Sequence, residues 1–121
     1  MNFWLGDYAI SVMERMIRNA KSISTCAGST NSLTITNPDN LTTTFMTQTV
    51  GEVVKIASSS GNFLTNDKVT VVGNINFTCT KPANAPTVVM IKFSLSQAGT
   101  VTRVEEKAQV DFQTTVSLRT Y

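Results

Sequence analysis

Residues 110–119 read Val-Asp-Phe-Gln-Thr-Thr-Val-Ser-Leu-Arg and carry the most regular pattern in the chain. Apolar or β-branched residues alternate with polar residues along the whole stretch. Successive side chains of a β-strand point to opposite faces, so the alternation predicts a strand with one buried face and one wet face. Such strands are typical of antiparallel sheets, and the stretch therefore indicates a β-rich domain.

Further strands are predicted upstream, where the same two-residue period begins at residue 32. We expect strands over residues 32–36, 41–46, 52–57, 69–80 and 88–96. The segment Asn37-Pro38-Asp39-Asn40 is a turn signal that joins the first two strands into a hairpin. Gly73 interrupts the longest segment and predicts a bulge or bend at that point.

An amphipathic helix is predicted before the strands, from about Asn2 to Ile23. Its apolar residues recur at spacings of three and four and form a stripe: Leu5, Ala9, Val12, Met16, Ala20 and Ile23. The apolar faces of the strands are the natural partner of this stripe. The expected fold class is therefore α+β, a single domain over residues 1–121 in which the helix packs on an antiparallel sheet formed by about residues 32–121.

The composition indicates where the protein works. The chain has 121 residues, of which only 15% are charged, and Thr, Ser and Asn supply much of its polar character. A hydroxyl-rich, charge-poor chain fits a β-rich protein outside the cytoplasm. The net charge is +2 and there is no long basic run, which argues against a dedicated nucleic-acid surface.

The chain contains no histidine, which excludes several kinds of chemistry. Ser-His-Asp and Cys-His catalysis both need an imidazole, and histidine is also the commonest metal ligand. Two cysteines alone do not complete a four-ligand zinc site. We therefore expect no enzyme activity, no catalytic residues, no cofactor and no metal site.

Cys26 and Cys79 are the two cysteines. Cys79 shares its strand parity with Ile75 and Phe77, so it is predicted to face the core, and Cys26 follows the helix. A disulfide between them would tie the helix end to the sheet and close a loop of roughly fifty residues, worth roughly 4 kcal/mol in the chain-entropy model. Two buried free thiols are the alternative.

Three other motifs have ordinary explanations. Asn66 and Asp67 could donate oxygens to calcium, but a turn before a strand accounts for them better. Glu105 and Glu106 are neighbours that point to opposite faces of a strand, so a solvated loop is the simpler interpretation. The acceptor patterns for glycosylation, Asn40-Leu41-Thr42 and Asn76-Phe77-Thr78, matter only in a eukaryotic secretory host.

Large apolar residues gather at the start of the chain, namely Phe3, Trp4, Leu5 and Tyr8. They can belong to the core, or they can form a surface that joins an upstream segment or a partner subunit. The opening stretch is too short to span a membrane and lacks the features of a signal peptide. We therefore expect that an N-terminal piece has been removed and that Met1 was supplied artificially. Trp4, Leu5 and Tyr8 are the candidate assembly surface.

Several segments carry a resemblance to a known family. They read MERMIRNAKSIS at 13–24, followed by Cys26, then LTND at 64–67, FTC at 77–79 and FQTTVSLR at 112–119. Together they resemble the globular domain of type IV pilin-like proteins, of the minor pilin or pseudopilin class, over nearly the whole chain. The resemblance implies a helix whose missing apolar half sits in the membrane before assembly and then packs in the filament core. The family's processing site and the acidic residue after it are absent, so no position is assigned to peptidase cleavage.

The first functional hypothesis is thus a minor subunit of a type IV pilus, a competence pilus or a type II secretion pseudopilus. Its partners would be other pilin or pseudopilin subunits, and its place would be a cell-surface filament or the periplasm. A second hypothesis is a surface-binding module, an adhesin or a DNA-uptake pilin, in which cationic residues meet phosphates: Lys55, Lys68, Lys81, Lys92 and Arg103. A third is a β-rich structural subunit of a phage or virus, which gives no reason for a lone leading helix.

Overall fold

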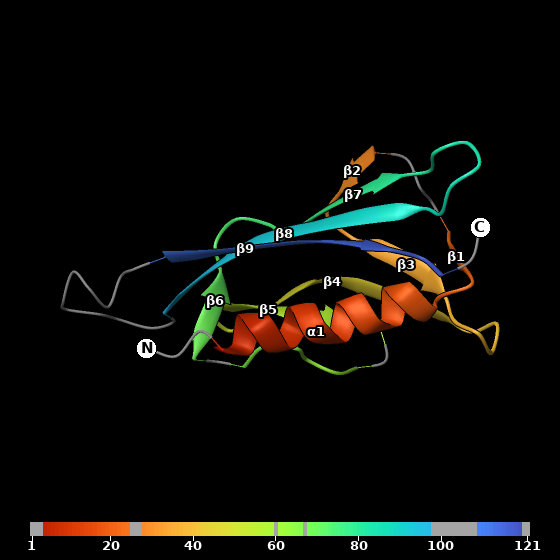
Figure 1. The fold of residues 1–121 in the computed structure, drawn as a ribbon. Helices are drawn as coiled ribbons and strands as arrows, with labels where there is room; N and C mark the ends of the chain where they lie inside the picture. Colours follow the sequence, from red (N-terminus) through yellow and green to blue (C-terminus); the bar gives the residue numbers. More distant parts are fainter. Residues whose placement is uncertain (1–3, 25–27, 60, 67, 98–108, 120–121) are drawn as a thin grey trace.

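The structure is a computed structural model that describes residues 4–24, 28–59, 61–66, 68–97 and 109–119. These residues form one helix and nine strands (Figure 1). The helix, α1, runs from Trp4 to Asn19, with Asp7 in its first turn and Arg18 in its last. Both charges have the sign that the helix dipole favours at those ends.

The first sheet contains four antiparallel strands in the order β1-β3-β4-β5. Their bounds are Ser22–Ile23 for β1, Leu33–Thr36 for β3, Thr42–Val50 for β4 and Val53–Ser58 for β5. The predicted turn at residues 37–40 joins β3 to β4, and Asn40 adopts the left-handed conformation there (φ 71°).

The second sheet is built around β8, Val88–Gln97, the longest strand described. One edge of β8 pairs with β7 (Asn76–Thr80) and, further along, with β6 (Val69–Val71). Its other edge pairs over nine residues with β9, Gln109–Ser117. The short strand β2, Gly28–Thr30, pairs with β7 at the far side.

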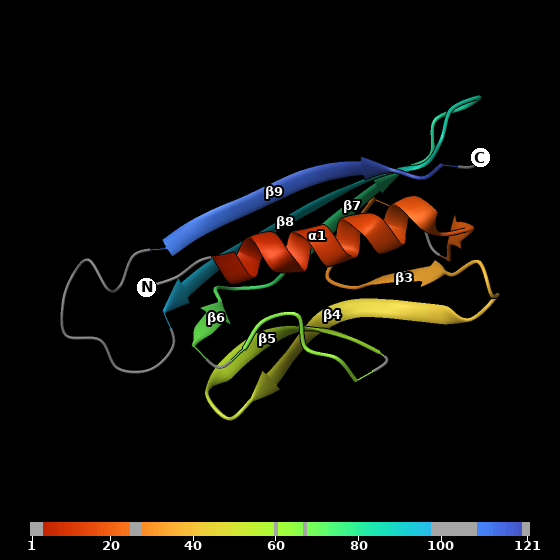
Figure 2. The same cartoon turned by 60° about the horizontal axis from the view of Figure 1, so that its bottom comes forward.

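One hydrophobic core fills the space between the two sheets and the helix. The helix contributes Ala9, Met13 and Ile17, each fully buried. The first sheet contributes Ile35, Phe45 and Ile56, and the second contributes Phe77, Ile91 and Leu95, again with no exposed area. Figure 2 shows α1 lying between β9 on one side and β3 and β4 on the other, so the helix closes one side of the gap between the sheets.

The predicted fold class is wrong. The protein is mostly β, with two antiparallel sheets, and its 16-residue helix is not laid on the face of a single sheet. The predicted stripe was right in part: Ala9 is buried, whereas Val12 and Met16 are only partly buried. The fully buried residues Met13 and Ile17 were not members of it, and the face that they form is shared between two sheets. Only one cysteine is among the described residues, so the single disulfide included in the predicted fold is not seen as a bond between described residues.

The predicted end of the helix at Ile23 is also wrong. The helix ends at Asn19, and Ser22 and Ile23 form β1, which pairs with Thr36 and Ile35. The amide of Lys21 donates to the Thr36 carbonyl at 2.8 Å, and the amide of Ser24 donates to the Thr34 carbonyl at 2.9 Å. These amides therefore find partners in β3 instead of in another helical turn.

The predicted strands lie close to the observed ones, with two differences. The segment predicted over residues 69–80 divides into β6 and β7, and Gly73 between them adopts a positive φ of 72°, as its position suggested. The strand predicted over 41–46 is longer, because β4 continues to Val50 along β5.

Candidate assembly surface

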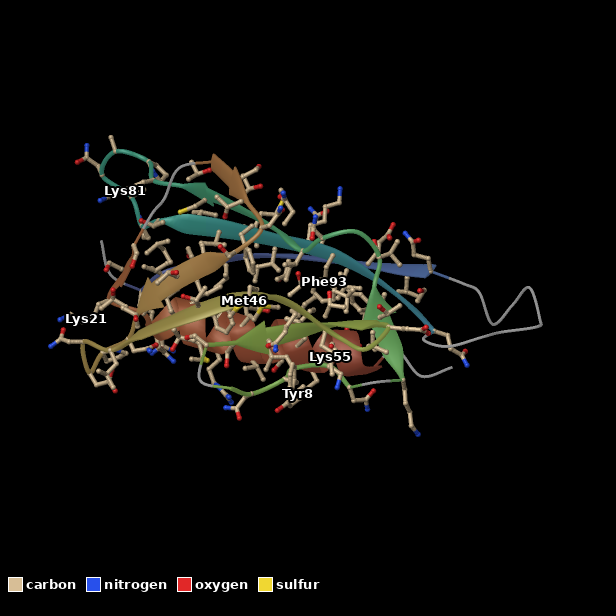
Figure 3. All side chains as sticks on the ribbon, turned by 180° about the vertical axis from the view of Figure 1, so that it is seen from behind. Tyr8, Lys21, Met46, Lys55, Lys81 and Phe93 are labelled. Atoms are coloured by element: carbon tan, nitrogen blue, oxygen red, sulfur yellow. The ribbon has the colours of Figure 1, made fainter. Side chains whose placement is uncertain are left out.

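The start of α1 contains the three residues of the predicted assembly surface. Trp4 and Leu5 lie in its first turn, and their side chains are outside the description. Tyr8 follows with half of its surface exposed, 50%, whereas its neighbour Ala9 has none. Figure 3 shows Tyr8 at the margin of the molecule. Tyr8 is thus an aromatic residue of the helix that the described core does not cover.

Two valines that sequence reasoning missed lie at the same end of the molecule as the start of α1. Val50 closes β4 and is 42% exposed, and Val72 follows β6 and is 41% exposed. Figure 2 shows β6 beside the beginning of the helix, and the end of β4 toward the same end of the molecule but farther from the helix. A valine beside a turn glycine, as Val50 is beside Gly51, was the available signal, because turn positions are rarely buried.

The outer flank of α1 forms a shallow groove beside β9. Its lining residues recur along one side of the helix: Asp7, Ile10, Ser11, Glu14, Arg15 and Arg18. Arg18 Nη2 lies 2.9 Å from Glu14 Oε1, in an ion pair one helical turn apart. Glu14 Oε2 also accepts a hydrogen bond from Thr114 Oγ1 of β9 at 3.4 Å. The groove therefore carries both signs of charge around one half-buried apolar residue, Ile10.

Of the two cysteines, only Cys79 is among the described residues. Cys79 lies on β7 with 6% of its surface exposed, which confirms that it faces the core. It is not a free thiol. Cys26 lies outside the described residues, so the pairing of Cys26 with Cys79 stays a prediction.

The cationic residues of the surface-binding hypothesis are not gathered on one element. Lys55 is on β5 of the first sheet, where its Nζ lies 4.8 Å from the ring centroid of Phe63. Lys92 is exposed on β8 of the second sheet, and Lys81 lies in the loop after β7 (Figure 3). Lys68 is exposed just before β6, and Arg103 lies outside the described residues.

The remaining motifs divide between described and undescribed residues. Asn66 Oδ1 accepts a hydrogen bond from the amide of Lys68 at 2.9 Å. This bond fits the turn before a strand that the sequence predicted at this point. Its neighbour Asp67 and the pair Glu105 and Glu106 lie outside the described residues. Asn40 is exposed in its turn, where its Oδ1 accepts from Lys21 Nζ.

Among the described residues, Asp111 on β9 is the carboxyl group whose pKa is shifted. Ser94 Oγ donates to its carboxylate at 2.5 Å from the neighbouring strand, and Gln109 Nε2 donates at 3.3 Å. These bonds favour the ionised form, so the pKa of Asp111 lies below its ordinary value, with the Ser94 bond the larger cause. Lys92 acts in the same direction, while partial desolvation opposes the shift.

Within the described residues, no three His, Cys, Asp or Glu side chains come together in a group that could hold a metal ion. Among those same residues, α1 is neither long nor apolar enough to cross a membrane.

Comparison with known proteins gives no family assignment. No protein-family model, curated protein or solved structure matches this chain.

Proposed function

We propose that this protein is a structural subunit of an extracytoplasmic filament, of the type IV pilus or type II secretion pseudopilus class, which assembles through the start of α1. The resemblance of its sequence segments to minor pilins and pseudopilins supports the filament class. The two-sheet fold does not add to that support, because it is not the architecture that the resemblance implied.

The observation that carries the proposal is an exposed aromatic residue near the start of α1, on a helix whose other face is buried. Ala9, Met13 and Ile17 are completely buried in the domain's own core. Tyr8, at the start, is half exposed. Val50 and Val72 add exposed apolar surface at the same end. Aromatic and aliphatic side chains grouped at one end of a domain are suited to burial in a subunit contact.

The first test is the natural gene. The codons before Met1 are expected to encode an apolar segment of about 20 residues, enough to span a bilayer, preceded by a prepilin cleavage site. An upstream sequence without that segment would show that the filament proposal is wrong.

The second test is incorporation into filaments sheared from the native host. Tyr8→Ala and Val72→Ser are expected to reduce the amount of this chain in the filament fraction, while the isolated variant domains keep their melting temperature. Leu41→Ser is the matched control, because Leu41 is 65% exposed in the β3–β4 turn, at the other end of α1. Equal loss in all three variants, or in none, would contradict assembly through the start of the helix.

A structural subunit of a phage or virus is the second candidate. The objection to it was the unexplained leading helix, and that objection is weaker now, because α1 completes the core of a two-sheet β-domain. Mass spectrometry of purified virions and of sheared filaments from the same culture separates the two candidates. The filament proposal requires the chain in the filaments and not in the particles.

The surface-binding alternative is less well supported, because the described lysines lie on different sheets and loops. Its DNA version predicts retention on a DNA column that falls steeply with salt. Absence of such retention would reject it.

A further inference from the structure

The outer edge of β9 is a regular strand edge whose backbone groups have no partner among the described residues. β9 pairs with β8 along one edge over its full length of nine residues. The amide of Leu118 donates to the Thr87 carbonyl at 3.0 Å, which extends the same ladder by one position. Residues in an antiparallel ladder alternate between bonded and non-bonded pairs, so this bond fixes the parity of the whole strand.

The parity shows which residues face outward. Residues 110, 112, 114, 116 and 118 direct their amides and carbonyls toward β8. Asp111, Gln113, Thr115 and Ser117 therefore direct theirs to the open edge. Arg119 has the same parity, and its amide donates outward to the Arg18 carbonyl of α1 at 3.1 Å. The helix end thus occupies the edge at residue 119 and leaves the four preceding outward positions without a described partner.

In contrast to the outer edge of β9, the β5 edge of the first sheet is occupied. On the outer side of β5, the amide of Val54 donates to Thr70 Oγ1 at 2.9 Å, and the amide of Ile56 donates to Thr65 Oγ1 at 3.1 Å. The amide of Leu64 donates to the Ile56 carbonyl at 2.7 Å. The chain itself therefore satisfies the backbone of β5, but it does not do so for β9 within the described residues.

β9 also lacks the features with which proteins usually protect an edge. The strand contains no Pro, no Gly and no Lys, and its one charged residue is Asp111. Natural edge strands are commonly short, kinked or charged, since an open regular edge is a template for another strand. A regular strand of nine residues with an unprotected edge, next to a groove, is suited to pairing with another strand.

The groove on α1 lies next to this edge of β9. Figures 1 and 2 both show α1 running below β9, and Gly6 and Glu14 meet Phe112 and Thr114 from that side. A strand added at the outer edge of β9 would lie above the groove flank. Ile10 would meet an apolar side chain of that strand, and the exposed carboxylate of Asp7 would favour a basic one.

The position of α1 decides what can occupy the edge. If two copies paired their β9 edges about a twofold axis, each helix would lie below its own strand, and neighbouring strands are about 4.8 Å apart. Packed helices need about 8–10 Å between their axes. A second copy paired in this way is therefore too bulky, whereas a single extended segment with no helix beneath it fits.

We infer that the outer edge of β9 and the adjoining flank of α1 form a binding site for one extended segment of another polypeptide. The segment adds to the second sheet as a sixth strand and places a basic residue near Asp7. This inference does not depend on the filament proposal, because it concerns the strand edge and not the exposed start of the helix.

The test supplies a strand covalently. The probe is the full chain extended after Tyr121 by a flexible linker of about 12 Gly and Ser residues and a strand of about nine residues. The strand alternates Thr and Val and carries one Lys toward its far end, where it would approach Asp7. Tethering provides a millimolar effective concentration, so a weak intrinsic affinity does not hide binding. The control carries the same extension with Pro at every second strand position.

Amide hydrogen exchange, followed residue by residue by NMR, is the readout. We expect the amides of Asp111, Gln113, Thr115 and Ser117 to exchange at least tenfold more slowly with the tethered strand than with the proline control. The amides of Phe112, Thr114 and Val116 should be equally protected in both, which shows that the domain is folded.

Three outcomes would overturn the inference. The outward amides could exchange equally fast in both proteins, which means that the edge accepts no strand. They could already be protected in the unextended chain at every concentration, which means that the edge is not open. They could become protected in the unextended chain as its concentration rises, which makes a second copy the occupant.

Discussion

At the scale of single residues, Gly6 is the described glycine that is packed closely, against the ring of Phe112. A Cβ placed on Gly6 would lie 2.3 Å from the ring of Phe112, which also stacks on Phe93 with ring centroids 5.2 Å apart. Only a residue without a side chain lets α1 approach β9 so closely. Gly6 thus permits the close distance between the helix and the strand.

Gly6→Ala is therefore expected to destabilise the domain. The clash should cost about 1–3 kcal/mol, against a gain of at most about 1 kcal/mol from better helix propensity. Ser11→Ala, at an exposed position of the same helix, is the control and should change stability by less than about 0.5 kcal/mol. Urea unfolding measures both. A Gly6→Ala variant that is more stable than the parent would mean that helix and strand are not in contact at this point.

The hydrogen bond from Ser94 is the largest cause of the lowered pKa of Asp111. We expect Ser94→Ala to raise the pKa of Asp111 toward its ordinary value of 3.8. Because the folded-state pKa is the lower one, the stabilisation is present above the unfolded-state pKa and is lost as the pH falls through the folded-state pKa. NMR titration of the Asp111 carboxyl carbon in both proteins checks this. An unchanged pKa in the variant would assign the shift to Gln109 and Lys92 instead.

Residue-level patterns predicted side-chain directions well. The alternation from Val110 to Leu118 gave the correct burial parity of β9, with Val116 and Leu118 buried. The parity of Cys79 was also correct. These predictions succeeded because the direction of a strand side chain depends only on its own position in the chain.

At the scale of elements, α1 contributes to stability mainly through its buried stripe. Met13 and Ile17 have no exposed surface and contact a core shared by both sheets. Met13→Ala should therefore lower the free energy of unfolding by about 2–5 kcal/mol. Arg15→Ala, on the exposed flank of the same helix, is the control and should have little effect. A small effect of Met13→Ala on the denaturant midpoint would contradict the packing of the helix between the sheets.

Element boundaries were predictable only where local signals decide them. The turn at residues 37–40 and the break at Gly73 were correct because Pro, Asn and Gly restrict or permit particular backbone angles. The end of α1 was not predictable, because Ile23 continues the three-and-four spacing of the stripe. Its actual role in β1 depends on Ile35, which is distant in the chain.

At the scale of the whole molecule, the arrangement of the strands into two sheets could not be predicted. Alternation shows that each strand has a buried face, but it does not say which strands share a sheet. The pairing of β2 with β7 joins residues about fifty positions apart, and such contacts leave no local signature. The open edge of β9 is likewise a consequence of strand order and not of the sequence of β9 itself.

The predicted disulfide between Cys26 and Cys79 would join distant parts of this arrangement. Intact-mass measurement without reductant should give a chain two hydrogens lighter than the reduced chain. Reduction should then lower the melting temperature, by a free energy of roughly 4 kcal/mol in the chain-entropy model. A native mass equal to the reduced mass would show that the two cysteines are not paired with each other.

The filament proposal is tested most directly by cross-linking in the native host. A photoreactive amino acid at position 8, half exposed at the start of α1, should link this chain to neighbouring filament subunits. The same group at position 41, exposed at the other end of the helix, should not. Cross-links to subunits from position 41 but not from position 8, or from neither, would contradict assembly through the start of the helix.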